Sequence, residues 1–126
     1  AAVALAIALV VSTPPAPGPA YVVVLAGADA RAALVATAAR GDNVLTIKPL
    51  APLAVPTDRE LELWALPAGA NPRSLGRIPS AGVGRLRLAS ALAAPALAVS
   101  LEPRGGSPTG LPTGPVLYSG KVERIE

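Results

Sequence analysis

The chain has 126 residues, of which 52% are hydrophobic, a formal net charge of +3, and no cysteine or histidine. This length predicts one domain plus a short tail, large enough to bury a core unaided. Without Cys or His, a zinc site is not expected, and a Ser-His or Cys-His nucleophile cannot be built. Phe and Met are also absent, so Leu, Val, Ile and Ala must fill a thin interior between sheets.

The basic character of the chain does not indicate a nucleic-acid partner. Its 11 Lys and Arg residues are scattered along the sequence, and no basic run alternates with aromatic residues. Nucleic-acid binding relies on clustered cations and, for single strands, on aromatic side chains that stack with bases. The pattern predicts a solvated, mildly basic surface.

Residues 1–11 are wholly apolar and are followed by a Pro-rich segment, residues 12–19. As a helix, residues 1–11 would span about 16 Å, whereas a membrane crossing needs ~20 residues. The run is the C-terminal part of a transmembrane helix, a remnant of a signal peptide, or a buried strand. No basic region precedes it, and no small-x-small cleavage site directly follows it. The order of apolar run, stiff Pro-rich linker and β-rich segment favours the transmembrane helix, so residues 1–11 are expected to lie within the membrane.

Residues 20–126 are predicted to form one all-β domain, an antiparallel β-sandwich of about eight short strands. Apolar residues alternate or run continuously over short segments, and turn residues recur every 8–12 residues, as in sandwiches. The first strand is continuously apolar and is expected to be buried on both faces. The predicted strands are Ala20–Ala26, Ala32–Ala38, Val44–Lys48, Glu60–Leu66, Ser74–Ile78, Gly84–Ala89, Leu97–Glu102 and a last one from Val116.

Three glutamates are the only candidates for acid-base chemistry. Glu60 and Glu62 alternate with leucines and are predicted to face solvent, with Arg85 and Arg87 as cross-strand partners. Glu102 ends another predicted strand, so a glycosidase-like carboxylate pair is conceivable. A structural role for these glutamates is favoured over a catalytic one. The sequence therefore predicts no catalytic, metal-binding or cofactor-binding residue and no enzyme.

Trp64 is the only tryptophan, and its parity places it on the same strand face as Glu60 and Glu62. Three interpretations are open: a twist or bulge turns Trp64 into the core, both sheet faces are partly covered, or Trp64 is an exposed anchor for a partner. A lone tryptophan in a small sandwich usually belongs to the core, which favours the first interpretation, Trp64 as a core plug.

The stretch of residues 97–120 is predicted to be two strands joined by a long Gly/Pro/Thr-rich connection. Pro103 ends the first strand because it has no N–H for the ladder, and Gly105 and Gly106 give the backbone freedom to turn. The sequence RGGSPTG lacks the lysine of a phosphate-binding loop, and no helix follows it. The connection is predicted to be a long hairpin loop. Residues 107–115 have the composition of an accessible segment, which would suit a peptide or protein partner.

Three segments resemble a known family in the same order: ELELWALP (residues 60–67), PRSLG (72–76) and AVSLEPRGGSPTGLPTGPVLYSG (98–120). The chain resembles the C-terminal domain of the anti-sigma-K factor (RskA-type). In that family an L-x-L-W strand precedes an S-L-G strand, and an E-P-x-G-G-S…P-T-G-P-V-x-x-S-G signature closes the chain. The resemblance marks as structural or interaction residues Trp64, Glu102, Pro103, Gly105, Gly106, Pro112, Thr113, Gly114, Pro115 and Gly120.

The resemblance implies a regulatory protein: a single-pass inner-membrane anti-sigma factor whose residues 20–126 are periplasmic or otherwise extracytoplasmic. Such a domain would control the release of an extracytoplasmic-function sigma factor, and so transcription, through regulated proteolysis. The sigma-binding region is absent from this sequence, so a sigma factor would be a partner only through that N-terminal region. A protease or a periplasmic protein is a further possible partner.

A second interpretation comes from another class of protein. It is a secreted or cell-surface β-sandwich that binds carbohydrate or peptide through Trp64 and residues 103–115. An exposed Trp64 would favour it, and a buried one would count against it. Edge strands can pair copies of a chain, but nothing in the sequence selects a dimer over a monomer.

Overall fold

The computed structural model describes residues 19–39, 43–88 and 92–125. These residues form β-strands and their connections. In this part of the chain no helix is long and apolar enough to span a membrane. The predicted transmembrane segment, residues 1–11, and all of the predicted linker except Pro19 lie outside the described residues.

All eight predicted strands are present, each within one or two residues of its expected start. They form because their apolar residues alternate with polar or small ones and because Gly, Pro, Asn or Asp residues follow most of them. β8 runs further than the expected pattern, through a glycine and a lysine. The strands are β1 Pro19–Ala26, β2 Ala32–Ala39, β3 Val44–Pro49, β4 Arg59–Leu66, β5 Arg73–Ile78, β6 Gly84–Arg87, β7 Ala96–Pro103 and β8 Val116–Arg124.

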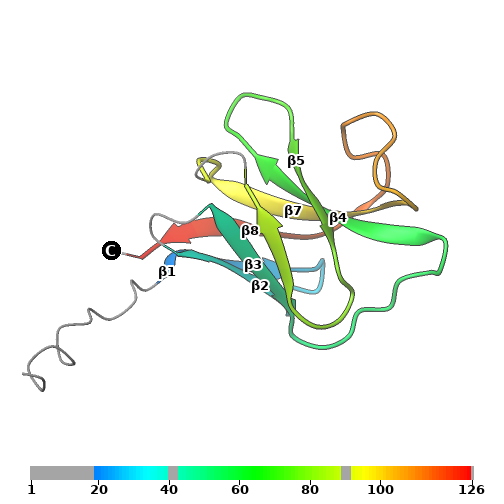
Figure 1. The fold of residues 1–126 in the computed structure, drawn as a ribbon, viewed down its shortest axis with the longest axis horizontal. Coiled ribbons are helices and arrows are strands. Elements are labelled where there is room, and N and C mark those ends of the chain that lie inside the picture. Colours follow the sequence, from blue (N-terminus) through cyan, green and yellow to red (C-terminus); the bar gives the residue numbers. More distant parts are fainter. Residues whose placement is uncertain (1–18, 40–42, 89–91, 126) are drawn as a thin grey trace, which may run out of the picture.

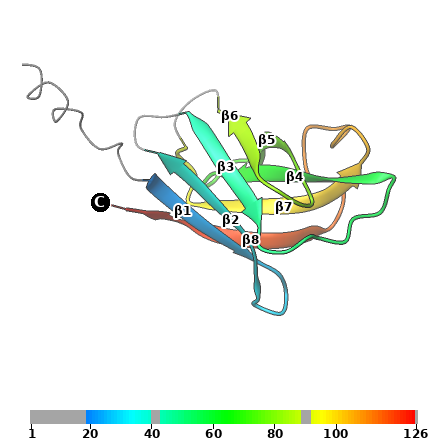
Figure 2. The same cartoon turned by 60° about the horizontal axis from the view of Figure 1, so that its bottom comes forward.

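The strands form one antiparallel sheet in the order β5-β4-β7-β8-β1-β2-β3-β6. The sheet twists and curls so that its two halves lie face to face, and β5 and β6, its edge strands, come near each other (Figure 1). The predicted all-β, sandwich-like fold is therefore confirmed, in the form of a single nearly closed sheet. Figure 2 shows β1, β2 and β3 crossing in front of β4 and β7.

The interior between the two halves is aliphatic. It contains alternate residues of each long strand, which point inward because side chains of a strand alternate between its faces. No aromatic residue belongs to its fully buried part; Tyr21 and Tyr118 pack against it from the rim. The buried residues are Val23, Leu25, Leu34, Ala36, Ala38, Leu45, Ile47, Leu61, Leu63, Ala65, Ile78, Leu88, Leu92, Leu97 and Val99.

The expectation that the first strand is buried on both faces is wrong. Val23 and Leu25 of β1 are fully buried, but Val24 between them is 48% exposed. β1 pairs with β2 on one side and β8 on the other, so its backbone is covered. A sheet that closes on itself has one interior, however, and no second layer covers the outer face of β1.

The chain enters and leaves the domain at the same end. Tyr21 of β1 lies opposite Arg124 of β8, and the backbone N–H of Ile125 donates to the carbonyl of Ala20 at 2.9 Å. β7 runs parallel to β1, because both are antiparallel to β8. The connection between β7 and β8, residues 104–115, therefore lies at the opposite end of the barrel (Figure 1). It is called the β7–β8 loop below.

Candidate functional site

The outer faces of β4 and β7 carry Trp64 and Glu102 of the family signature, together with other polar residues. In the register of this pair, Glu60 lies opposite Glu102, Glu62 opposite Ser100, and Trp64 opposite Ala98. Opposed residues of an antiparallel pair share a face. These six side chains therefore lie on the side away from the aliphatic interior, where the β7–β8 loop contacts Glu60, Glu62 and Glu102.

Trp64 is fully buried on this outer face. Its indole N–H donates to Ser100 Oγ at 2.8 Å, and it is not part of the main interior cluster. The pairing of β4 with β5 shifts between Leu63 and Trp64, yet the pairing with β7 stays regular there. Trp64 is buried, but the favoured interpretation, a core plug turned inward by a twist or bulge, is wrong. The second interpretation holds: the sheet is covered on both faces here, and the ring lies outside the main core.

Glu102, near the end of β7, is the centre of the contact between strand and loop. Its side chain has no exposed surface. It accepts hydrogen bonds from Ser100 Oγ at 2.5 Å and from the backbone N–H groups of Thr113 and Gly114 at 3.1 Å. The hydroxyl of Thr113 donates to the same carboxylate. A continuous chain of hydrogen bonds thus runs from the Trp64 indole through Ser100 and Glu102 to the far end of the loop.

Two opposing effects set the pKa of Glu102. Burial raises the pKa, because a carboxylate loses its hydration inside the protein. Hydrogen bonds from Ser100, Thr113 and Gly114 stabilise the charged form and leave the pKa below its ordinary value. Glu102 is therefore ionised near neutral pH, and its charge is stabilised by hydrogen-bond donors from its own strand and the loop.

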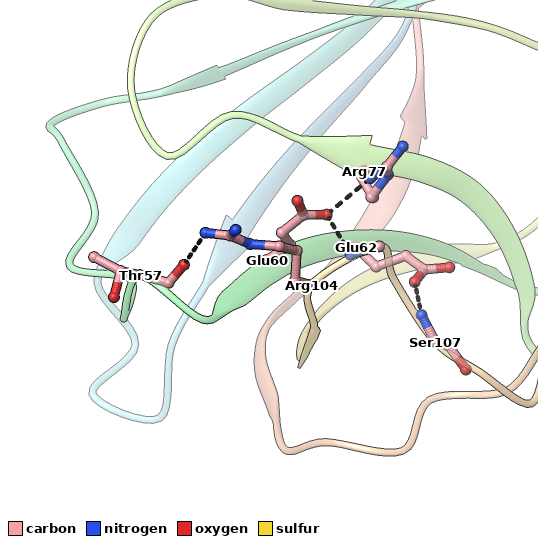
Figure 3. A network of polar contacts seen from close by, with 7 residues as sticks. Thr57, Glu60, Glu62, Arg77, Arg104 and Ser107 are labelled. Carbon is pink, nitrogen blue, oxygen red and sulfur yellow. Dashed lines mark hydrogen bonds and ion pairs between the residues drawn. The ribbon is translucent and has the colours of Figure 1, made fainter.

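Glu62 and Glu60 hold the first part of the same loop (Figure 3). Glu62, which is 6% exposed, accepts hydrogen bonds from Ser107 N at 2.7 Å and from Ser74 Oγ of β5 at 2.5 Å. Glu60 Oε2 lies 3.1 Å from Arg77 Nη1 and accepts the Gly105 N–H at 3.2 Å. The three carboxylates and the backbone amides of the β7–β8 loop form what is called the carboxylate latch below.

The prediction for the strand glutamates is wrong in two respects. Glu62 does not face solvent, because the β7–β8 loop covers it. Arg85 and Arg87 are not the cross-strand partners, because they belong to β6, which pairs with β3 at the other end of the sheet. The cation beside Glu60 is instead supplied by β5, the neighbour of β4 (Figure 3).

Glycines are required where the loop and its strand pass close to other backbone. A Cβ on Gly106 would lie 2.8 Å from Glu62 Oε1, and this residue has φ +94°, which disfavours side chains. A Cβ on Gly114 would lie 1.7 Å from the carbonyl oxygen of Leu101. The glycines of the signature thus let the backbone reach the carboxylates and the strand beside them.

The structure brings together six of the ten residues of the family signature: Trp64, Glu102, Gly105, Gly106, Thr113 and Gly114. Pro103 is the last residue of β7, as predicted. Pro115, from its carbonyl, accepts the Leu101 N–H at 3.0 Å, and Pro112 is half-buried in the loop. Gly120 lies apart, in β8, where a Cβ would meet the carbonyl oxygen of Val24 at 2.0 Å.

Sequence reasoning missed the contributions of Glu60, Glu62, Ser74, Ser100 and Ser107. One signal was available: Glu60, Glu62 and Trp64 share a parity on one strand, as Ser100 and Glu102 do on the other. A tryptophan in register with two carboxylates indicates a covered face. The covering segment itself is distant in sequence and has no such signal.

The chemistry of this site is that of a structural fastening. Each of the three carboxylates accepts at least two hydrogen bonds from protein donors, so all three hold protein groups in place. Among the residues that the structure describes, no group of three or more His, Cys, Asp or Glu residues has a metal-binding arrangement. The latch holds the β7–β8 loop in one conformation.

Replacing Ser100 by alanine is expected to lower the free energy of unfolding by about 2 kcal/mol, because the buried Trp64 indole N–H loses its acceptor and Glu102 loses a donor. Urea unfolding followed by circular dichroism measures this change. Ser119→Ala on the exposed side of β8 is the matched control and is expected to change stability by less than about 0.5 kcal/mol. Equal losses in both variants would contradict a buried hydrogen-bond chain.

These features define a small all-β domain in which the longest of the three signature segments fastens one loop to the outside of the sheet. The family model for "Anti-sigma-K factor rskA, C-terminal" matches residues 1–116, and the chain belongs to this family. The family is one of anti-sigma factors, which are regulators and whose partner is a sigma factor. Neither a curated protein nor a solved structure matches the chain.

Proposed function

We propose that residues 20–126 are the extracytoplasmic, periplasmic domain of a single-pass inner-membrane anti-sigma factor. In this role the domain controls the release of an extracytoplasmic-function sigma factor through regulated proteolysis. Residues 1–11 supply the C-terminal part of the transmembrane helix, and residues 12–19 supply the linker. The sigma factor binds a region N-terminal to this sequence.

The observation that carries the proposal is the family match, which begins at residue 1 and so includes the apolar run and the linker with the β domain. An apolar run, a Pro-rich segment and a folded domain in this order suit a membrane-anchored protein whose domain lies across the membrane from its partner.

The place of β1 in the sheet supports a role in limiting proteolysis. β1 begins at Pro19, where the proposed linker ends, and it pairs on both sides, with β2 and with β8. A protease needs an extended, accessible segment, and a central strand supplies one only when the domain opens. The folded domain therefore protects β1 from cleavage. Its opening would extend the accessible segment beyond Pro19.

The proposal is tested with the full-length protein in its own membrane and a reporter gene driven by the sigma factor. Because the folded domain is proposed to limit proteolysis, deleting residues 21–126 is expected to increase cleavage of the protein and to raise reporter activity. A Gly114→Ala variant, whose domain is expected to unfold, should behave like the deletion, whereas Gly110→Ala should behave like the wild type. If cleavage and reporter activity stay the same in the deletion strain, the regulatory role is wrong.

The alternative of a carbohydrate-binding surface built on Trp64 loses its main support. The indole has no exposed surface, and its N–H is engaged by Ser100. Stacking on a sugar requires an exposed aromatic face, which Trp64 does not offer.

A further inference from the structure

The barrel has one opening in its hydrogen-bonded wall, between the edge strands β5 and β6. Each of these strands pairs on one side only, β5 with β4 and β6 with β3, and no backbone pairing joins them among the described residues. Near the middle they meet: a Cβ on Gly76 would lie 3.1 Å from Leu86 Cδ2. Towards the start of β5 and the end of β6, residues of both strands line a pocket. The opening between β5 and β6 is called the seam.

A pocket of about 300 Å³ occupies the open end of the seam. Its volume is at the lower end of the range for ligand sites in proteins. Its lining is mainly apolar, and none of the described residues that line it is Asp or Glu. The lining residues include Ala65 at the end of β4, Leu75 in β5, and Leu88 and Leu92 on the opposite side.

Two arginines line the same pocket from opposite sides of the seam. Arg73 is the first residue of β5 and Arg87 is the last residue of β6, and both are exposed. In the described part of the chain the ion pairs are Arg31 with Asp29 and Arg77 with Glu60, so neither pocket arginine has a carboxylate partner. The pocket thus combines apolar walls with two available guanidinium groups.

We propose that the seam binds an extended peptide segment of a partner protein, with an apolar side chain in the pocket and a carboxylate between Arg73 and Arg87. The free edge of β5 would pair with the peptide backbone, as in β-strand addition, and the pocket and arginines would select the side chains. Guanidinium groups bind carboxylates through two parallel hydrogen bonds, which favours an acidic residue over an amide.

The charges also argue against a second copy of this chain as the occupant. Pairing two β5 edges would bring Arg73 and Arg77 near the same residues of the other copy, and charged side chains on edge strands oppose such pairing. An acidic peptide is instead attracted to these arginines, because its charge is opposite to theirs. The seam is therefore selective for an acidic strand.

The proposal extends beyond the proposed function and does not depend on it. The seam pocket lies at the end of the barrel where β1 begins, because β5 starts and β6 ends there. A strand bound in the seam would close the barrel beside the entry of the chain. The peptide experiment below measures binding by the isolated chain, so its failure leaves the reporter experiment above unaffected.

The test measures the fluorescence anisotropy of labelled hexapeptides titrated with the complete 126-residue chain in mild detergent. The peptides are β-branched and carry one Leu and, two residues later, Glu, Gln or Lys, because residues i and i+2 of a strand point to the same face. The Glu peptide is expected to bind at least about tenfold more tightly than the Lys peptide, because the two arginines attract one and repel the other. Alternate residues of the peptide would point their N–H groups at β5. N-methylation of that set of amides is therefore expected to abolish binding, and N-methylation of the other set is expected to leave it unchanged.

Variants locate the site on the seam. The double variant Arg73→Glu/Arg87→Glu is expected to weaken binding of the Glu peptide at least about tenfold and to strengthen that of the Lys peptide. Arg85→Glu reverses one arginine charge on β6 outside the pocket, and is expected to keep the wild-type preference. Trp64 emission checks that each variant is folded.

Three outcomes would overturn the proposal. The first is that none of the peptides binds at millimolar concentration, and the second is that Glu and Lys peptides bind equally. The third is that the double variant, with unchanged Trp64 emission, keeps the preference of the wild type. A free C-terminal carboxylate is distinguished from an acidic side chain by comparing amidated and non-amidated peptides, and the proposal expects the Glu peptide to bind in both forms.

Discussion

Replacing Gly114 by alanine is expected to lower the free energy of unfolding by at least about 4 kcal/mol, enough to unfold a small domain. A Cβ at this position would lie 1.7 Å from the carbonyl oxygen of Leu101 and 2.9 Å from its carbonyl carbon. Both atoms belong to the backbone of β7, which pairs with β4 and β8. No side-chain rotation relieves such a contact, so either the β7–β8 loop leaves the sheet or β7 shifts.

The matched control is Gly110→Ala in the same loop. This glycine has φ +82°, and a Cβ added to it would meet nothing within 4 Å, so the substitution costs only the strain of a left-handed alanine, about 1 kcal/mol. Urea unfolding of both variants, followed by Trp64 emission and circular dichroism, makes the comparison. Similar stabilities for the two variants would mean that the loop does not pack closely against β7.

Replacing Glu102 by alanine is expected to lower the free energy of unfolding by about 3 kcal/mol or more. The substitution leaves the backbone N–H groups of Thr113 and Gly114 and the hydroxyl of Ser100 without their acceptor. Glu102→Gln is expected to lose less, because one carbonyl oxygen remains, although its NH₂ group then faces donors. Urea unfolding at neutral pH measures both losses, with Glu123→Ala on exposed β8 as the control.

The contribution of Glu102 also depends on pH with a definite sign. Its pKa is lower in the folded protein than the ordinary glutamate value of about 4.3. The stability that the carboxylate supplies is therefore complete above about pH 4.3 and is lost as the pH falls through the folded pKa. The stability difference between the wild type and Glu102→Gln should be constant from neutral pH to about pH 5 and shrink in stronger acid. A difference that grows on acidification would contradict the latch.

The two variants test different parts of one arrangement. Gly114→Ala tests the close contact between the backbone of the β7–β8 loop and that of β7. The Glu102 variants test the buried carboxylate that accepts hydrogen bonds from this loop. Only a glycine lets the loop reach β7, and only an ionised carboxylate satisfies the amides that arrive there. The E-P-x-G-G-S…P-T-G part of the family signature therefore has one structural role, which is to fix the β7–β8 loop against the sheet.

The strands were predictable because their signals are local. In β4 the leucines Leu61 and Leu63 alternate with other residues and both are buried in the interior, and at the end of β7 Pro103 stops the strand as expected. Alternation and the missing N–H of proline act within a few residues, so the sequence carries them directly. The residue types of the core were equally predictable, since the chain has few aromatic residues.

The burial of Glu62 and the exposure of Val24 were not predictable in this way. Both depend on what lies over a strand face, and that is decided by the order of strands in the sheet and the path of a distant loop. Alternation divides the residues of a strand between its two faces, but it does not show which face is covered. The pattern of one strand also gives no information on which strands or loops lie beside it. Arg77, and not Arg85 or Arg87, lies beside Glu60 because β5 is the edge neighbour of β4.

The sequence by itself determined the all-β class, the positions of the strands, the aliphatic interior and the family signature, because each depends on residue types within a short segment. Only the tertiary structure decided the closing of one sheet into a barrel, the carboxylate latch over Trp64, and the open seam between β5 and β6. These three features arise where segments far apart in the chain meet. Their energies come from burial and hydrogen bonds between such segments, which exist only once the strands are in register.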